Sequence, residues 1–372
     1  MRPTVIEALR RFLPEFLKTS PALSPHQRRA LWAITHCRTA ALGGQAFGCK
    51  PCGQIHFAYH SCNHKACPQC GRAQTARWVR RELGKLINVP YFLVTFTLPA
   101  QLRGCFFGPP SKQFYDLFFA AVAAALQEEL ATAKGLRAHV SGFMAALQTW
   151  TQCLEFHPHI HCLVPGAGLN QKGRVVQVRQ PDFLVYRPHL QNAFRRHFRR
   201  LLKENGWEVD PAVWSKDWGV DIQPVGNGAA ALKYLATYVA RTALSDSRMV
   251  HLNTKAVTFR WKDRSQGNLI RDLQLPGIEF VTRYLRHVLP RGLRSIRYYG
   301  FYHPTAKANR LRLQLHTGVP VNLGCTRPLP SPSQAPLCPC CKRPMKLLFL
   351  LGASGHGRGP PGRLSSTQRQ TV

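Results

Sequence analysis

Acidic side chains are scarce in this sequence. Its 372 residues include only 17 Asp and Glu against 51 Lys and Arg, which leaves a formal net charge of +34 at pH 7. Such an excess favours a polyanionic partner, because each phosphate that a basic side chain neutralises releases condensed counterions. Nucleic acid in general, ribosomal RNA and a membrane surface all fit this charge. Composition therefore predicts a polyanion-binding protein and names no reaction.

The sequence also lacks a long apolar run, a secretory signal and an internal repeat. The longest apolar run, residues 117–126, is too short to span a bilayer, so we interpret it as a buried helix and expect no membrane partner. Residues 1–13 are charged and amphipathic, without the apolar centre of a signal peptide. The 13 cysteines are therefore expected to be reduced thiols. The absence of a fixed period argues against a solenoid.

Hydrophobic periodicity predicts a mixed α+β fold. Runs of β-branched and aromatic residues indicate strands, and longer segments of helix-forming residues indicate helices. Strands are expected over residues 91–97, 139–150, 159–164, 175–178 and 256–261. Helices are expected within residues 1–36 and over 117–130, 190–203, 229–241 and 277–288.

Cysteines dominate the segment that follows the N-terminal helices. Two Cys-x2-Cys pairs lie there with fourteen residues between them. They comprise Cys49, Cys52, Cys67 and Cys70. Four thiolates at this spacing suit one tetrahedral Zn²⁺, whose binding would supply local folding energy; buried unligated thiols are the alternative. Cys37 and Cys62 are candidate ligands of a second zinc site whose ligand set the sequence leaves open.

The remaining cysteines carry weaker signals. Near the C-terminus a third Cys-x2-Cys pair, Cys338 and Cys341, has no further pair after it, so the sequence does not favour a metal there. Cys105, Cys153 and Cys162 lack partner spacing and are interpreted as buried thiols.

Three histidines alternate along the strand expected near residue 160. In a strand, His157, His159 and His161 project from one face, because side chains alternate with a period of two. Two such imidazoles, with His159 and His161 as the candidate pair, can hold one Mg²⁺ or Mn²⁺ that acts as a Lewis acid on a phosphate. The third ligand is left open between four side chains: His157, Gln148, Gln152 and Glu155. Taken alone, His-x-His is more often structural than catalytic.

Two tyrosines share one face of the helix expected over residues 229–241. Tyr234 and Tyr238 are four residues apart, and therefore one helical turn apart. A phenol with a pKa of about 10 is a weak nucleophile, so a metal that withdraws charge from a phosphate would make its attack feasible. Lys233 and Arg241 are candidate DNA contacts that would assist. The alternative is aromatic packing within an amphipathic helix.

These motifs occur in an order that resembles the rolling-circle insertion-sequence transposases of the two-tyrosine HUH type, the family named from insertion sequence 91. The resemblance covers about residues 24–350. Besides the cysteine pairs it rests on residues 37–44, 96–103, 157–164, 233–241 and 297–301. Residues 61–67 depart from the family pattern, because Ala66 stands where a histidine is usual, and His64 is a candidate substitute.

The resemblance implies a fold, a reaction and a partner. The fold is an HUH-type nuclease core, an antiparallel sheet flanked by helices, with an N-terminal zinc-binding module. His159 and His161 would hold the catalytic Mg²⁺ or Mn²⁺, and Zn²⁺ would be structural. Tyr234 and Tyr238 would attack DNA, leaving a 5′-phosphotyrosine and a free 3′-hydroxyl. The partner would be single-stranded DNA at the ends of the element, in the bacterial cytoplasm and associated with the nucleoid, and the oligomeric state is left open.

The resemblance also implies a division of the chain. The expected parts are an N-terminal helical segment at 1–36, a zinc-binding domain at 37–88, a two-tyrosine catalytic domain at 89–310, a basic C-terminal segment at 311–352 and a disordered tail at 353–372.

Three other functions fit parts of the pattern. A plasmid or phage replication initiator or relaxase shares the nicking chemistry and differs in the DNA that it recognises. A catalytically inactive DNA-binding protein descended from a transposase would keep the affinity and lose the cleavage. An RNA-binding domain with structural zinc would bind nucleic acid without any covalent step.

Overall fold

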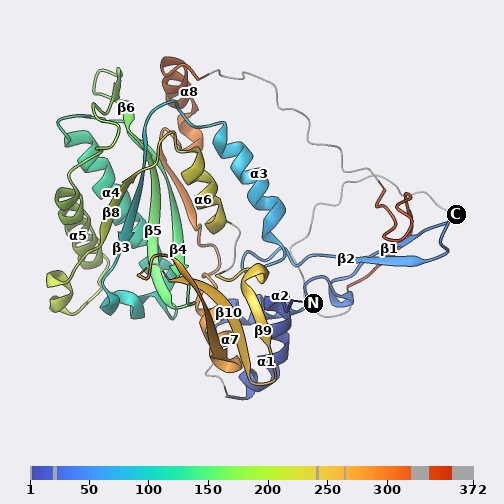
Figure 1. The fold of residues 1–372 in the computed structure, drawn as a ribbon. Coiled ribbons are helices and arrows are strands. Elements are labelled where there is room, and N and C mark those ends of the chain that lie inside the picture. The colour runs from blue at the N-terminus through green and yellow to red at the C-terminus, as the bar shows by residue number, and fades with distance from the viewer. Residues whose placement is uncertain (1, 20–22, 240–242, 264, 320–334, 354–372) are drawn as a thin grey trace. The chain divides into compact units, whose positions relative to one another are not determined.

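The computed structural model describes residues 2–19, 23–239, 243–263, 265–319 and 335–353, and the side chains of 71–74 and 237–239 fall outside that description. Contacts divide the chain into two compact units. The first comprises Met1–Thr35 and Asn63–Thr326, and the second His36–Cys62 and Arg327–Val372. Helices combine with antiparallel sheets (Figure 1), which confirms the predicted mixed α+β class.

A five-stranded sheet forms the centre of the first unit. Its strands are β3 (Tyr91–Thr97), β4 (Gly142–Trp150), β5 (Phe156–Pro165), β8 (Val220–Pro224) and β12 (Ile296–Gly300). The order β12-β4-β5-β3-β8 puts β5 in the middle, and every pairing is antiparallel. The three strands predicted first from the sequence are therefore the three inner ones, while the two edge strands were not predicted.

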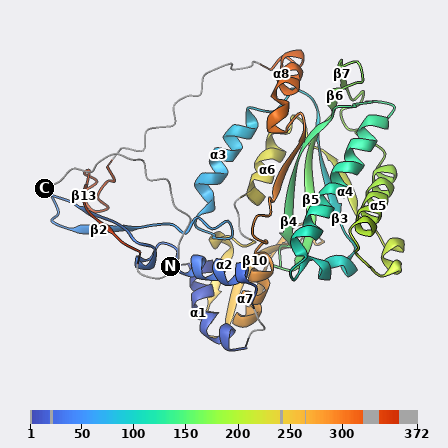
Figure 2. The ribbon, with the colours of Figure 1, turned by 180° about the vertical axis from the view of Figure 1, so that it is seen from behind.

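Helices α4 (Ser111–Thr132) and α5 (Arg187–Glu204) cover one face of this sheet, as Figures 1 and 2 show from opposite sides. Alternate side chains of β5 point toward these helices and share one buried cluster with them. They are Ile160, Cys162 and Val164. Because strand side chains alternate between faces, the residues between them face the other way.

Helices α3 (Gly71–Leu83) and α6 (Ala229–Val239) lie side by side against the opposite face. Leu232 and Leu235 of α6 are buried in a second cluster that includes Leu163 of β5. Trp78 of α3 belongs to the same cluster. Helix α3, which the sequence assigned to the zinc-binding segment 37–88, is thus part of the packing around the central sheet.

A glycine fixes the start of α6. Gly228 has a φ of +77°, and a β-carbon at this position would lie 2.6 Å from the ring of Tyr91. Glycine is required here both by the backbone conformation and by the space available. The Asn227 side chain then accepts a hydrogen bond from the N–H of Ala229 at 3.1 Å, which satisfies one of the unpaired donors of the first turn.

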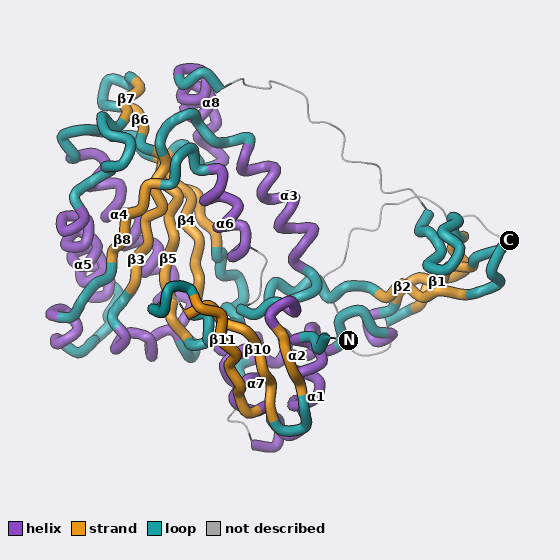
Figure 3. The backbone as a smooth tube through the Cα atoms, viewed as in Figure 1, coloured by secondary structure: helices purple, strands orange, loops and turns teal. Residues whose placement is uncertain are grey.

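A smaller layer of the first unit combines a three-stranded sheet with three helices (Figure 3). Its strands, in the order β11-β10-β9, are β9 (Met249–Leu252), β10 (Ala256–Asp263) and β11 (Leu269–Pro276). The helices are α1 (Val5–Thr19), α2 (Pro25–Thr35) and α7 (Gly277–Arg286). Gly277 and Phe12 show how closely α7 and α1 pack, since a β-carbon on the glycine would lie 2.0 Å from the phenyl ring.

The second unit contains one antiparallel sheet built from both ends of the chain. It consists of β1 (Gly44–Gly48), β2 (Ile55–Tyr59) and β13 (Lys346–Leu351), in the order β13-β1-β2. In this register Gly48 is opposite Lys346. The sequence did not predict β13, and with it the C-terminal segment joins the zinc-binding region.

The remaining elements are short. Strands β6 (Ala167–Leu169) and β7 (Val175–Gln177) form a hairpin, α8 (Lys307–His316) follows β12, and 3₁₀ turns cover Ala40–Leu42, Ala100–Phe106, Pro211–Ser215, Asp246–Arg248 and Pro304–Ala306. None of the helices that the structure describes has the length and apolar character needed to cross a membrane. Apart from Ala353, the tail predicted at 353–372 lies outside the described residues.

Candidate active site and zinc-binding cysteines

The paired histidines lie on the central strand, on the face that α6 covers. His159 is opposite Thr97 on β3 and Gln148 on β4. His161 is opposite Thr95 on β3. The two imidazole rings have their centroids 4.8 Å apart. The strand therefore brings both rings to one side of the sheet, as the sequence predicts.

Hydrogen bonds orient both imidazoles. Nδ1 of His159 lies 2.8 Å from the carbonyl oxygen of His157, and a carbonyl only accepts, so Nδ1 carries the proton and Nε2 keeps its lone pair. Nδ1 of His161 lies 3.0 Å from the hydroxyl of Thr95. Such partners on the second nitrogen are typical of histidines that bind a metal.

Gln148 is the candidate third ligand that fits best. Its Oε1 is buried and has no hydrogen-bond partner among the described residues, while its Nε2 donates to the carbonyl of Trp150 at 2.7 Å. A buried amide oxygen without a partner costs free energy unless a donor or a cation satisfies it. Gln148 is also the direct cross-strand neighbour of His159, and Mg²⁺ and Mn²⁺ favour oxygen ligands.

His157 is held by a different interaction. Its Nδ1 accepts a hydrogen bond from the guanidinium of Arg103 at 2.8 Å. Burial, followed by the positive charge of Arg103, lowers the pKa of His157. The proton of this neutral ring is therefore on Nε2, which disfavours His157 as a ligand. Gln152 and Glu155 line the same cavity as the histidines, and nothing further in the described contacts favours either.

Tyr234 borders the histidines from α6. Its side chain is 37% exposed, and its ring centroid lies 5.9 Å from that of His161 with the rings at 77°. Lys233, the preceding residue, is exposed. Tyr238 lies on the same helix, but its side chain is outside the described residues, and so is the whole of Arg241.

A cavity of about 1440 Å³ joins these groups. Strands β3, β4, β5 and β8 line it together with α6, and residues 261–263 of β10 contribute from the smaller sheet. Both charge signs are present, because the lining includes Arg248 and Lys262 as well as Asp221 and Asp263. The cavity exceeds the size of a typical small-molecule pocket, so it can accept a segment of polymer at the histidines.

Two cysteines of the predicted zinc quartet form a group with cysteines near the C-terminus. The Sγ atoms of Cys49 and Cys52 lie within 4.8 Å of those of Cys338 and Cys341. Cys37, Cys62, Cys67 and Cys70 are not in this group. It offers four thiols, the number that a structural zinc requires. The group thus agrees with a zinc-binding module, whereas the spacing alone did not reveal which pairs belong together.

The other candidates around these cysteines play different roles. His64, the candidate substitute for a ligand at Ala66, accepts a hydrogen bond from the N–H of that alanine at 3.2 Å and is in none of the ligand groups found among the described residues. Cys105, Cys153 and Cys162 are in none of the ligand groups found among the described residues. Of these three, only Cys162 is buried as predicted, whereas Cys105 and Cys153 are half-buried. No cysteine that the structure describes forms a disulfide.

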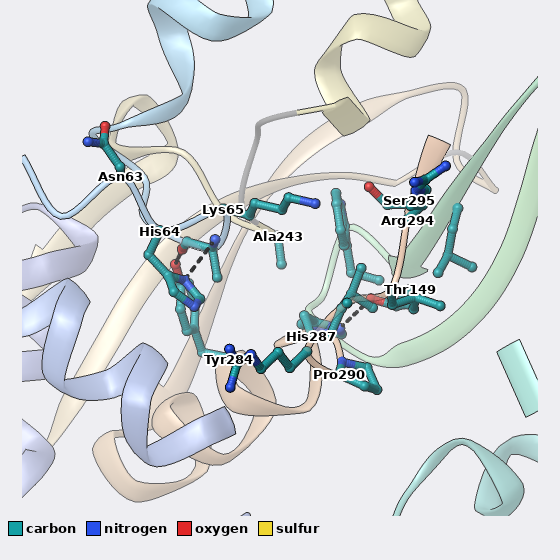
Figure 4. Close-up of a pocket in the computed structure, with 17 residues that line it drawn as sticks. Asn63, His64, Lys65, Thr149, Ala243, Tyr284, His287, Pro290, Arg294 and Ser295 are labelled. Atoms are coloured by element: carbon teal, nitrogen blue, oxygen red, sulfur yellow. Dashed lines mark hydrogen bonds between the residues drawn. The ribbon is translucent and has the colours of Figure 1, made fainter. Parts of the chain in front are cut away.

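A second cavity, of about 350 Å³, lies beside His287 (Figure 4). The hydroxyl of Thr149 lies 3.2 Å from Nδ1 of His287. Nε2 of His287 donates a hydrogen bond to the carbonyl of Leu154 at 3.2 Å. Tyr284, on the same wall, donates to the carbonyl of Ala66 at 2.6 Å. Both nitrogens of His287 are thus used in tying α7 to β4 and to the turn before β5. We interpret this histidine as structural.

Burial makes His287 a source of pH-dependent stability. Burial is the largest cause that lowers its pKa from 6.5 to about 4. Between about pH 6.5 and about pH 4 the unfolded chain therefore binds a proton that the folded protein does not, so stability falls as the pH falls. The expected loss is roughly 3 kcal/mol across this window. Urea unfolding followed by tryptophan fluorescence at a series of pH values measures it.

The matched control for this pH effect is His287→Gln. Glutamine can make both hydrogen bonds and does not titrate, so its unfolding free energy should fall by less over the same pH window. Equal pH dependence in the variant and in the wild type would assign the effect to other groups.

Comparisons with known proteins agree with these features. Residues 142–310 match a family of sequences described as "Putative transposase", and residues 8–98 match one described as "Transposase zinc-binding domain". The chain is 35% identical over 355 residues to "Putative transposase y4qJ" of Sinorhizobium fredii (strain NBRC 101917 / NGR234), covering 90% of this chain and 87% of the relative.

A second relative is more distant. The chain is 27% identical over 284 residues to "Transposase for insertion sequence element IS801" of Pseudomonas savastanoi pv. phaseolicola, covering 71% of this chain and 67% of that protein. No solved structure matches the chain.

Proposed function

Because the chain belongs to the IS91-type family of transposases, which carry an N-terminal zinc-binding domain, we propose that it nicks and rejoins single-stranded DNA through a tyrosine nucleophile. The observation that carries this proposal is the 5.9 Å separation between the ring centroids of Tyr234 and His161. At this separation, a phenol oxygen and a metal ion on the imidazole can reach the same phosphate.

The proposed metal site consists of two imidazoles and one amide. His159 and His161 supply nitrogen ligands from β5, and Gln148 supplies its buried Oε1 from β4. We propose that this arrangement on the central strand is an HUH-type nuclease core. A bound Mg²⁺ or Mn²⁺ would act as a Lewis acid that polarises a phosphate and helps to orient it.

The proposed chemical step uses the side chain of Tyr234. Its oxygen attacks the phosphorus of the scissile phosphodiester, and the bond from phosphorus to the 3′ oxygen breaks. The phenol proton leaves to solvent, and the 3′ oxygen gains a proton to become a free hydroxyl. The product is a 5′-phosphotyrosine that conserves the energy of the bond, so a later 3′-hydroxyl can reverse the step and join a new strand. Tyr238 is the candidate for the second attack.

The charge of the chain supports a nucleic-acid substrate. A formal net charge of +34 favours DNA through counterion release and sets no sequence preference. Exposed Lys233 stands next to Tyr234, where it can contact a phosphate beside the scissile bond. A single strand fits the chemistry better than a duplex, because a scissile phosphate can approach two side chains in a cavity without first being unpaired.

A covalent-adduct assay tests this function. Full-length protein is incubated with single-stranded DNA from the element's ends in Mn²⁺, in Mg²⁺ or in EDTA, and the products are separated under denaturing conditions. We expect a protein–DNA adduct that needs the divalent ion, together with a released fragment that ends in a 3′-hydroxyl. DNA binding without an adduct in either Mn²⁺ or Mg²⁺ would instead favour an inactive DNA-binding descendant of a transposase.

The amide ligand makes a separate prediction. Gln148→Ala removes the oxygen donor, so half-maximal adduct formation should require on the order of 10-fold more Mn²⁺. Gln148→Glu places a carboxylate at the same position and should restore the metal requirement or lower it, because Mn²⁺ prefers an anionic oxygen. Titration of adduct formation against Mn²⁺ concentration measures both effects.

The open alternatives for the third ligand supply the controls. Gln152→Ala and Glu155→Ala should leave the Mn²⁺ requirement within about threefold of the wild type, a change of under 1 kcal/mol. A large rise in the Mn²⁺ requirement of either variant, with no rise in Gln148→Ala, would indicate that the third ligand lies in the turn between β4 and β5.

A further inference from the structure

Two cysteine loops of the second unit face each other. Cys49 and Cys52 follow β1, while Cys338 and Cys341 precede β13. The antiparallel pairing of β1 with β13 places the end of one strand beside the start of the other, with Gly48 opposite Lys346. Strand pairing thus brings together two loops that are far apart in the sequence, and both belong to the same compact unit.

The two loops have the same backbone hydrogen bonds. The N–H of Gly53 donates to the carbonyl of Cys49 at 2.8 Å, and that of Lys342 donates to the carbonyl of Cys338 at 2.9 Å. The N–H of Cys49 donates to Gln54, and that of Cys338 donates to Arg343 in the corresponding place.

The residues that follow the second cysteine of each loop also share one backbone conformation. Gly53 and Lys342 are both left-handed, with φ values of +67° and +60°. A lysine rarely adopts this conformation. Its presence at the corresponding position indicates that the second loop is held in the same shape as the first, with both cysteines of each loop directed to the same side.

The separations between sulfur atoms match those of a tetrahedral metal site. The Sγ atoms of Cys49 and Cys341 are 3.5 Å apart, and those of Cys52 and Cys338 are 3.9 Å apart. Four sulfurs at about 2.3 Å from a zinc ion lie about 3.8 Å from one another in a tetrahedron. A disulfide would require about 2.05 Å. The four thiols are therefore spaced for a shared ion and not for a covalent bond.

The surroundings resemble a small core around a closed site. Cys49 and Cys338 are buried, and Met345 is buried beside them with Phe47 packed against the group. The sheet of this unit has three short strands, too few to bury an extensive core of its own. A structural ion would supply the missing stabilisation.

From this geometry we infer that Cys49, Cys52, Cys338 and Cys341 bind one structural Zn²⁺, with half of its ligands coming from the C-terminal segment. The ion joins β13 to β1 and closes the second unit. The zinc-binding module is therefore completed by residues near the C-terminus, outside the N-terminal zinc-binding domain. The inference does not depend on the proposed nuclease activity, since none of these residues lies in the cavity at His159 and His161.

Zinc content tests the inference. Full-length protein is purified without added metal, and zinc per chain is measured by inductively coupled plasma mass spectrometry. The double variant Cys338→Ser, Cys341→Ser should hold one zinc fewer per chain than the wild type, and so should Cys49→Ser, Cys52→Ser. Combining all four substitutions should remove no more zinc than either pair. Unchanged zinc in the Cys338, Cys341 variant would overturn the inference.

A neighbouring thiol provides the matched control. Cys340 lies between the two proposed ligands, is exposed, and forms an alternative group with Cys338 and His56. Cys340→Ser and His56→Ala should each retain the full zinc content. Loss of one zinc in both of these variants, with none lost in Cys341→Ser, would assign the ion to the alternative group and refute the proposed set.

A measurement on the wild type avoids any variant that fails to fold. Native protein is alkylated with iodoacetamide with and without a zinc chelator, and the modified peptides are identified by mass spectrometry. The four proposed ligands should be protected together and become reactive together on chelation, while Cys340 reacts in both conditions. Equal alkylation of Cys338 with and without chelator would contradict zinc binding there.

Discussion

Tyr234→Phe is expected to reduce formation of the covalent protein–DNA adduct by on the order of 10³-fold or more. The substitution removes only the phenol oxygen, which is the atom that would bond to phosphorus, and leaves the ring beside His161. Because a phenyl ring cannot form a phosphodiester, any adduct that remains must come from another nucleophile. The adduct is measured with single-stranded DNA from the element's ends in Mn²⁺, under denaturing conditions and in single turnover.

Tyr238→Phe is the matched variant on the same helix. It removes the same atom one turn further along α6, and we expect it to retain the first cleavage while losing the transfer to a second strand. Double substitution should abolish both steps. Neither change removes a positive charge, so DNA affinity should stay within about twofold of the wild type, a difference of about 0.4 kcal/mol. An undiminished adduct in the double variant would rule out the tyrosine mechanism.

The inner part of the fold could be predicted from the sequence, because its strands are buried on both faces. Strands β3, β4 and β5 are rich in β-branched and aromatic residues, which is the pattern of an inner strand. The edge strands gave weaker signals. Strand β8 has the sequence Val-Asp-Ile-Gln-Pro with a single buried residue, Val220, and resembles a polar loop. Hydrogen bonding to β3 determines its conformation.

The placement of the two histidines could be predicted from the sequence because one element determines it. A period of two places His159 and His161 on one face regardless of the rest of the chain, and the structure has both on the face toward α6. The choice among the candidate third ligands depends on the register between β4 and β5, which only the folded sheet defines. This register puts Gln148 opposite His159, and no spacing within the sequence could have separated it from Gln152.

The grouping of the cysteines was harder to predict for a similar reason. Two cysteine pairs close in sequence suggest one shared ion, since a short loop costs little entropy to close. The fold instead pairs Cys49 and Cys52 with cysteines near residue 340, because β13 pairs with β1. Long-range strand pairing of this kind leaves no local signal. The sequence shows the third Cys-x2-Cys pair, but it does not show that this pair lies beside Cys49 and Cys52.

His159→Ala and His161→Ala are each expected to lower metal-dependent cleavage by on the order of 10³-fold. Lewis-acid stabilisation of a phosphoryl transfer is worth several kcal/mol, and each 1.36 kcal/mol corresponds to a factor of ten in rate. Two imidazoles on adjacent positions of one face act as a unit, so the loss of one removes most of the affinity for the ion. The Mn²⁺ affinity itself, measured by electron paramagnetic resonance, should fall in parallel.

His157→Ala separates this effect from a general disturbance of β5. His157 lies on the same face of the strand and binds Arg103, so its loss should leave Mn²⁺ binding within about threefold of the wild type, less than 1 kcal/mol. The double variant His159→Ala, His161→Ala should be no worse than either single variant, because a ligand pair that acts as a unit is lost with its first member. If the two single losses instead multiplied in the double variant, each histidine would have a separate role and the shared metal would be excluded.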